Sequence, residues 1–167
     1  MNDDRSAGMM IPAAGTLPGA GTLPDGPLEV LTLGLQGETF AIEARQVREI
    51  LDPVPVTEVP NARPFVGGII NVRGKVVPLT DLRPRFGMEA APPTIDTRIV
   101  VVEIVLDGEP TIVSILADKV HEVTEIEAAA IEQAPRVGMR WRPDFIRCIG
   151  KRRDGFVIVP DLERLLT

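Results

Sequence analysis

The amino-acid sequence predicts a mostly β protein made of two small barrel-like lobes. Short β-branched runs recur along the chain, and several of them end at turns that contain Gly or Asp. One set of motifs also occurs twice, because residues 72–86 and residues 151–166 each hold a turn, an apolar strand, a Pro and an Asp-Leu pair. Two lobes of about 70 residues, with about five short strands each, favour paired small barrels over a sandwich. A lobe of this size buries little core alone, so we expect the lobes to pack together and to leave a groove between them.

The chain opens with a segment that predicts no regular structure. Residues 1–27 hold nine Gly or Pro residues, contain AGTLP twice, and show no periodic apolar face. This composition is typical of a disordered tail. We therefore expect a Gly/Pro-rich tail over residues 1–27 and one domain of two β lobes over residues 28–167.

The first lobe begins with a predicted hairpin and a predicted helix. Residues 28–35 and 39–42 are strand-like runs on either side of a turn that contains Gly37. Residues 44–51 are expected to form a short helix that ends before two prolines. The apolar side of this helix consists of Val47, Ile50 and Leu51.

A second hairpin is predicted at the centre of the first lobe. Two β-branched runs over residues 69–79 flank a single Arg-Gly pair, and Gly is the residue that most easily adopts positive φ. Arg73 is therefore expected at the exposed tip of the hairpin. Asp81 is expected to cap a short helical turn directly after the second strand.

The second lobe repeats this organisation. The Asp-Gly pair at residues 107–108 lies between two β-rich runs and predicts another hairpin. A further hairpin is expected around Gly155, and Asp161 opens a last short helix with an apolar side made of leucines. The remaining predicted elements are a strand over residues 120–126 and one or two helical turns over residues 128–133.

Composition and charge limit the classes of function. The 167 residues are 44% hydrophobic and 25% charged, which is typical of a soluble globular domain. A net charge of -6, few aromatic residues and no Tyr disfavour a nucleic-acid partner. No apolar run approaches the roughly 18 to 20 residues that span a bilayer, and Asp3 and Asp4 stand where a secretory signal is basic. We therefore expect a cytoplasmic protein without direct membrane insertion.

The residue types that perform catalysis or bind metals are scarce. The chain has one His, His121, and one Cys, Cys148, far apart in sequence, so no metal site is expected. The two serines are Ser6, in the predicted tail, and Ser114, inside an apolar strand. No nucleophile lies near a base in the sequence pattern, so no catalytic residue and no cofactor is predicted.

The central hairpin carries a resemblance to a known family. Residues 59–87, VPNARPFVGGIINVRGKVVPLTDLRPRFG, resemble the CheW family of chemotaxis coupling proteins, and residues 40–50, FAIEARQVREI, are similar to the same family. The resemblance implies two intertwined five-stranded SH3-like β-barrels with short helices and no catalysis. It also implies two partners, the cytoplasmic tip of a chemoreceptor and the regulatory domain of a CheA-type histidine kinase. Self-association in arrays and recruitment to the inner face of the membrane through receptors are implied as well.

The resemblance and the residue pattern together nominate a partner-binding site. Arg73 matches the Arg of the family's Asn-x-Arg-Gly motif, and it is expected to bind a partner, to brace a neighbouring loop or to lie in a solvated turn. Glu49 lies in the family's Val-x-Glu-Ile pattern and either binds a partner or belongs to a solvated helical face. Val47 and Ile50 either line an apolar groove for a receptor helix or belong to the core. The candidate partner-binding residues are Arg73, Glu49, Val47, Ile50, Gly68 and Gly74, and the two glycines are expected to act through the backbone.

Other residues keep two interpretations each. Trp141 is either an exposed anchor or a residue that closes a core. Lys151, Arg152 and Arg153 form either a solvated turn or a surface for a membrane or an acidic partner.

The leading interpretation is a non-enzymatic scaffold that couples chemoreceptors to a histidine kinase. The alternative is a small β-barrel enzyme or ligand sensor that uses the groove between the lobes. A nucleic-acid-binding barrel is a third interpretation, which the acidic charge disfavours.

Overall fold

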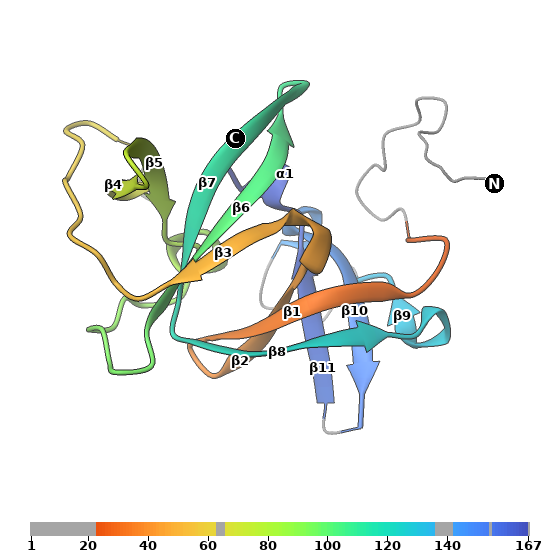
Figure 1. The fold of residues 1–167 in the computed structure, drawn as a ribbon. Helices are drawn as coiled ribbons and strands as arrows, with labels where there is room; N and C mark the ends of the chain where they lie inside the picture. The colour runs from red at the N-terminus through yellow and green to blue at the C-terminus, as the bar shows by residue number, and fades with distance from the viewer. Residues whose placement is uncertain (1–22, 63–65, 136–141, 154, 167) are drawn as a thin grey trace.

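Two β-sheets make up most of the structure, a computed structural model that describes residues 23–62, 66–135, 142–153 and 155–166 (Figure 1). The predicted tail lies almost entirely outside these residues, as does Trp141, so the interpretations of the tail and of Trp141 stay predictions. The first strand begins at Leu28, where the predicted domain begins.

The larger sheet has the strand order β8-β1-β2-β11-β10-β9 and the smaller sheet has the order β3-β6-β7-β5-β4. The strands of the larger sheet are β1 (Leu28–Leu35), β2 (Glu38–Glu43), β8 (Lys119–Ile126), β9 (Ile131–Glu132), β10 (Ile146–Arg152) and β11 (Gly155–Pro160). Those of the smaller sheet are β3 (Val47–Leu51), β4 (Val66–Val72), β5 (Lys75–Thr80), β6 (Arg98–Leu106) and β7 (Glu109–Ala117). The short helices are η1 (Ala44–Gln46), η2 (Pro84–Phe86), η3 (Ala128–Ala130), η4 (Pro143–Phe145) and α1 (Leu162–Leu165).

Each sheet takes strands from both halves of the sequence. The hairpin β1-β2 lies beside β8 and β11, and the hairpin β6-β7 lies beside β3 and β5. Two neighbouring pairs, β2-β11 and β5-β7, are parallel, whereas the other pairs are antiparallel. The mostly β fold and the intertwined arrangement are therefore confirmed. The two consecutive 70-residue lobes are not, because the strands are exchanged between the halves, and the two-residue β9 gives the larger sheet a sixth strand.

Three hairpins turn through two residues with positive φ. The pairs are Gln36-Gly37 (φ 50° and 81°), Arg73-Gly74 (φ 51° and 84°) and Asp107-Gly108 (φ 51° and 79°). Positive φ at both positions defines the type I′ turn, whose twist matches that of the flanking strands. The Gly in each pair adopts this conformation without the steric cost of a Cβ, so the predicted hairpins are confirmed.

The helix predicted over residues 44–51 is wrong for most of its length. Only Ala44–Gln46 forms a single 3-10 turn, and Val47–Leu51 is strand β3, which pairs with β6. The register shifts between Val47 and Glu49, so a β-bulge interrupts the alternation of side chains. The apolar spacing that resembles a helix therefore arises from a bulged strand whose partner lies about 50 residues further along the chain.

Two further helical predictions are partly right. Residues 128–133 form one 3-10 turn, η3, followed by strand β9. Asp81 accepts a hydrogen bond from the backbone N–H of Arg83 at 3.0 Å, but the helical turn is η2, whose N-cap position is Arg83 itself. The last helix is confirmed as α1, and the side chain of Asp161 caps it by accepting from the N–H of Arg164.

The largest hydrophobic cluster joins the two sheets. It includes Leu33, Phe40 and Ile42 from the larger sheet and Val100, Val102 and Ile115 from the smaller sheet. Each sheet also has a smaller cluster of its own, centred on Val30 and Cys148 in one and on Ile70 and Leu79 in the other. Since the shared cluster is the largest, the sheets are held together mainly by buried apolar contacts.

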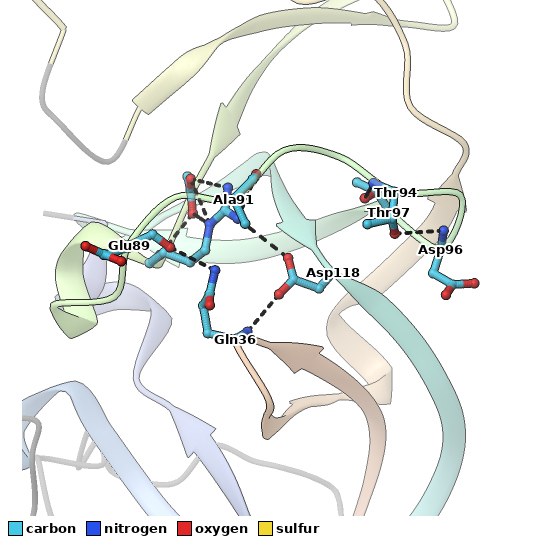
Figure 2. Close-up of polar contacts among 9 residues, drawn as sticks. Gln36, Glu89, Ala91, Thr94, Asp96, Thr97 and Asp118 are labelled. Atoms are coloured by element: carbon cyan, nitrogen blue, oxygen red, sulfur yellow. Dashed lines mark hydrogen bonds and ion pairs between the residues drawn. The ribbon is translucent and has the colours of Figure 1, made fainter.

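A buried guanidinium fixes the chain where the two sheets meet. The side chain of Arg83 is 5% exposed, donates to both carboxylate oxygens of Asp81 at 2.8–3.1 Å, and lies 3.6 Å from the Asp118 carboxylate. Hydrogen bonding to Asp81 is the largest cause that raises the pKa of Arg83. Asp118 also accepts from the backbone N–H of Gln36, and the Gln36 side chain donates to the carbonyl of Glu89 (Figure 2). The β1-β2 turn, the corner between β7 and β8, and the loop after η2 are thus joined by one network of hydrogen bonds and an ion pair.

Arg85, two residues after Arg83, holds the C-terminal helix α1 in place. Arg85 donates to the carbonyls of Leu165 and Arg164 at 2.9 and 3.2 Å, and its guanidinium lies 4.9 Å from the ring centroid of Phe145. Carbonyls at the end of a helix lack intrahelical donors, so Arg85 satisfies two groups that water would otherwise solvate.

The buried thiol of Cys148 leads to a first prediction. Burial raises its pKa from 9.0 to about 11, so the fold favours the neutral thiol. This contribution to stability is complete below the unfolded pKa near 9.0 and is lost as the pH rises through about 11. At pH 8 we expect a disulfide reagent such as Ellman's reagent to react at least roughly a hundredfold more slowly with the folded chain than with the chain in urea. Equal rates in the two states would contradict the burial of this thiol.

Candidate functional site

An exposed ion pair connects the tip of the β4-β5 hairpin to strand β3. Arg73 Nε and Nη2 donate to Glu49 Oε2 and Oε1 at 3.0 and 3.2 Å, a two-pronged contact between a guanidinium and a carboxylate. The Arg73 side chain is 80% exposed and that of Glu49 is 25% exposed. The hydrogen bond to Glu49, followed by its negative charge, raises the pKa of Arg73. The structure therefore brings together two of the residues that the sequence nominates separately.

Local contacts present Arg73 in this position. The residue has a φ of 51° in the type I′ turn, and the backbone N–H of Gly74 donates to the Asn71 side-chain oxygen at 2.8 Å. A Cβ at Gly74 would meet nothing within 4 Å, so this glycine serves the turn conformation alone. Asn, Arg and Gly of the motif thus form one turn that aims the guanidinium at β3.

Gly68 has a different role, in which space is decisive. A Cβ at this position would lie 2.5 Å from the carbonyl oxygen of Thr57 and 2.6 Å from Val56 Cγ1. The close approach is held by two backbone hydrogen bonds of 2.9 and 2.8 Å between Thr57 and Ile69. Gly68 therefore lets the segment before β4 lie against the sheet edge. Its role is to allow this close approach of two backbone segments.

The two apolar candidates in β3, Val47 and Ile50, differ in burial. Val47 is half-buried and packs against the cluster between the sheets, whereas Ile50 is 44% exposed. Val76, three residues after Arg73, is 72% exposed and was not singled out from the sequence. The exposure of Val76 follows from the alternation of side chains along a strand, because its neighbour Val77 is buried. We call Glu49, Ile50, Arg73 and Val76 the Arg73 surface.

A cleft of about 500 Å³ lies where the two sheets and α1 meet. Its apolar lining includes Ile42 from the larger sheet, Ile104 and Val105 from the smaller sheet, and Leu162 from α1. The charged residues that line it are Glu43, Arg45, Arg147, Asp161 and Glu163. The groove expected between the lobes thus has a counterpart, but its lining includes neither Val47 nor Ile50.

A family model described as the CheW-like domain matches residues 29–167. This chain belongs to the CheW family. The resemblance seen in the sequence is therefore confirmed over nearly the whole described structure.

Several relatives of this CheW-family chain are named chemotaxis proteins. It is 31% identical over 139 residues to the chemotaxis protein CheW of Klebsiella aerogenes, which covers 83% of this chain and 81% of that protein. It is 30% identical over 123 residues to CheW of Rhizobium meliloti, covering 74% and 77% of the two chains. The crystal structure of the scaffolding protein TtCheW from Thermoanaerobacter tengcongensis matches with a TM-score of 0.75 and 31% identity, over 84% of this chain and 88% of that one.

Membership of the CheW family decides the class of function. The CheW-family chain is a coupling adaptor in chemotaxis signalling and not an enzyme, as the sequence predicts. The alternative of a β-barrel enzyme or ligand sensor has no support from these relatives.

His121 and Ser114 of the CheW-family chain lie on different strands and differ in burial. His121 is exposed on β8, and the buried Ser114 hydroxyl donates to the carbonyl of Pro78 at 2.7 Å. Within the described ranges, no three His, Cys, Asp or Glu side chains gather as metal ligands would. The same part of the chain holds no helix that is long and apolar enough to cross a membrane.

Proposed function

We propose that this CheW-family chain couples the cytoplasmic tips of chemoreceptors to the regulatory domain of a CheA-type histidine kinase. The observation that carries the proposal is the exposed Arg73 guanidinium, which Glu49 holds in place through two hydrogen bonds. The protein acts in the cytoplasm as a non-enzymatic scaffold and reaches the inner face of the membrane through the receptors. Copies of the chain also associate with one another in arrays that contain the receptors and the kinase.

The Arg73 surface suits a folded partner such as the kinase regulatory domain. Arg is enriched at the centre of protein interfaces, and apolar side chains around it exclude water when a partner binds. Ile50 and Val76 are 44% and 72% exposed, so a partner would remove apolar area from water. The Glu49 carboxylate holds the guanidinium in place before binding and lowers the entropy that binding costs.

The cleft between the sheets suits a receptor helix. Helical segments dock by laying an apolar stripe into a groove, and Ile42, Ile104, Val105 and Leu162 provide apolar lining from three elements. The cleft and the Arg73 surface are defined by different residues, so a receptor and a kinase have separate contacts. Coupling then requires that the contacts differ between the signalling states of the receptor.

We expect Arg73→Ala to weaken binding to the kinase regulatory region roughly tenfold, because the guanidinium contact and its orientation by Glu49 are both lost. Binding to a receptor cytoplasmic fragment is expected to stay within about twofold, since Arg73 does not line the cleft. Isothermal titration calorimetry with each partner measures both affinities. Arg45→Ala is not a suitable control because Arg45 lines the cleft; Arg153→Ala, an exposed Arg in another turn, is the matched control.

The outcomes separate the site from the function. An unchanged affinity of Arg73→Ala for both partners would remove Arg73 from the binding site and leave the coupling function standing. If the wild-type chain binds neither partner from its own organism, the coupling proposal is wrong.

A further inference from the structure

Helix α1 supplies part of the lining of the cleft, although it has only four residues. Leu162 and Glu163 line the cleft from α1, which packs against strand β6 (Figure 1). Isolated helices shorter than roughly 12 residues are marginal in water, so a helix of this length does not fix its own position. The places of Leu162 and Glu163 in the cleft therefore depend on contacts that other segments make with α1.

Distant segments hold α1 at both of its ends. At the start, the backbone N–H of Asp161 donates to the carbonyl of Phe145 at 2.8 Å. At the end, Arg85 donates to the carbonyls of Leu165 and Arg164 at 2.9 and 3.2 Å. Hydrogen bonds from an ionised donor are stronger than neutral ones, and Arg85 is half-buried, which reduces the competition from water. Arg85 thus fixes the end of α1 from a segment 80 residues earlier in the chain.

Arg85 reaches the cleft indirectly. It lies in η2 and is not among the described residues that line the cleft. A substitution of Arg85 therefore leaves the lining side chains themselves unchanged. It alters instead the support of the backbone that carries Leu162 and Glu163.

Arg142 offers an internal comparison for Arg85. Each of the two guanidiniums lies 4.9 Å from the ring centroid of Phe145. The Arg142 side chain donates to Asp144 at 2.6 Å, whereas Arg85 donates to the carbonyls of α1. The two residues thus share the contact with the ring and differ in the contact with the helix.

We propose that Arg85 is a positioning residue for the receptor contact of the cleft. Its two hydrogen bonds keep the end of α1 in place, so that Leu162 and Glu163 line the cleft before a receptor helix binds. Without these bonds α1 has to be ordered during binding, and that ordering lowers the affinity. The inference rests on the proposed receptor contact and adds to it a residue outside the cleft.

Arg85→Met in the full chain tests this role. Met keeps much of the aliphatic side chain but donates no hydrogen bond. We expect its affinity for a receptor cytoplasmic fragment to fall roughly tenfold in calorimetric titrations. The affinity for the kinase regulatory region is expected to stay within about twofold, because the contact between Arg73 and Glu49 does not involve Arg85. Arg85→Lys keeps the charge and one donor group, so we expect an intermediate loss of about threefold.

Hydrogen exchange measures the position of α1 without any partner. The N–H groups of Leu165 and Leu166 donate to the carbonyls of Asp161 and Leu162, both at 3.0 Å. In Arg85→Met we expect these two amides to exchange at least about tenfold faster than in the wild type, because the end of the helix opens locally. The amides of β6 are expected to keep their wild-type rates.

Arg142→Met is the matched control, because it removes a guanidinium from the same ring without touching the carbonyls of α1. We expect it to change the receptor affinity less than about twofold and to leave the exchange of α1 unchanged. Thermal unfolding checks that each variant folds, and Arg85→Lys replaces Arg85→Met if the Met variant does not fold.

Three results would overturn the inference. Wild-type receptor affinity in Arg85→Met would mean that the bonds to α1 do not support the cleft. An equal loss in Arg142→Met would assign the effect to packing on Phe145, and an equal loss for receptor and kinase would indicate a general change of the fold. In each case receptor binding by the wild type leaves the coupling function intact. Absence of wild-type binding to the receptor fragment would overturn both proposals.

Discussion

Gly68→Ala is expected to destabilise the protein by about 3 kcal/mol and to lower its melting temperature by roughly 6 to 12 °C. The new Cβ would lie 2.5 Å from the Thr57 carbonyl oxygen, a backbone atom that cannot move without breaking its hydrogen bond to Ile69. A φ of 146° is also strained for any residue with a Cβ. Urea and thermal unfolding measure the loss.

Gly74→Ala is the matched control, because its φ of 84° is equally unusual but a Cβ there would meet nothing within 4 Å. Backbone strain alone should cost about 1 kcal/mol. Equal losses for the two variants would show that space at Gly68 is not limiting.

Arg83→Met is expected to destabilise the protein by about 3 kcal/mol. Met fills much of the aliphatic volume but leaves the Asp81 carboxylate, 19% exposed, without its cation. It also removes the charge beside Asp118, which receives the backbone N–H of Gln36 from the β1-β2 turn. The loss should therefore appear as a lower urea midpoint with little change in the slope of the unfolding transition.

Arg142→Met provides the comparison for this substitution. Arg142 pairs with Asp144 at 2.6 Å on the surface, where its side chain is 69% exposed. Exposed ion pairs of this kind contribute little to stability, because water screens the charges and two long side chains lose freedom. If Arg142→Met costs as much as Arg83→Met, burial of the Arg83 pair does not govern its energy.

Local features of the fold follow from the sequence. The three type I′ turns are readable because each has Gly at its second position between β-branched runs. The cap of α1 is equally local, since Asp161 bonds the N–H of Arg164 three residues later. In both cases the atoms that decide the conformation lie within a few residues of each other.

Features that depend on distant partners do not follow from the sequence in the same way. The β3 segment resembles a helix until its bulged pairing with β6 is known. Glu49 and Arg73 are each nominated by the family pattern, but their contact depends on how the hairpin tip bends toward β3. The charges of the cleft come from η1, β10 and α1, so no short motif contains them.

The exchange of strands between the sheets has a consequence for biosynthesis. Strand β2 pairs in parallel with β11, which lies at the opposite end of the chain, through Phe40 and Ile158. Domains generally fold as units, and during synthesis the N-terminal part of the chain becomes available for folding first. Here the hairpin β1-β2 must wait for β11 before the larger sheet is complete, and apolar residues such as Leu33 and Phe40 lack their final neighbours until then. We therefore expect truncation before β11 to leave these apolar residues exposed and to give a product that proteases remove.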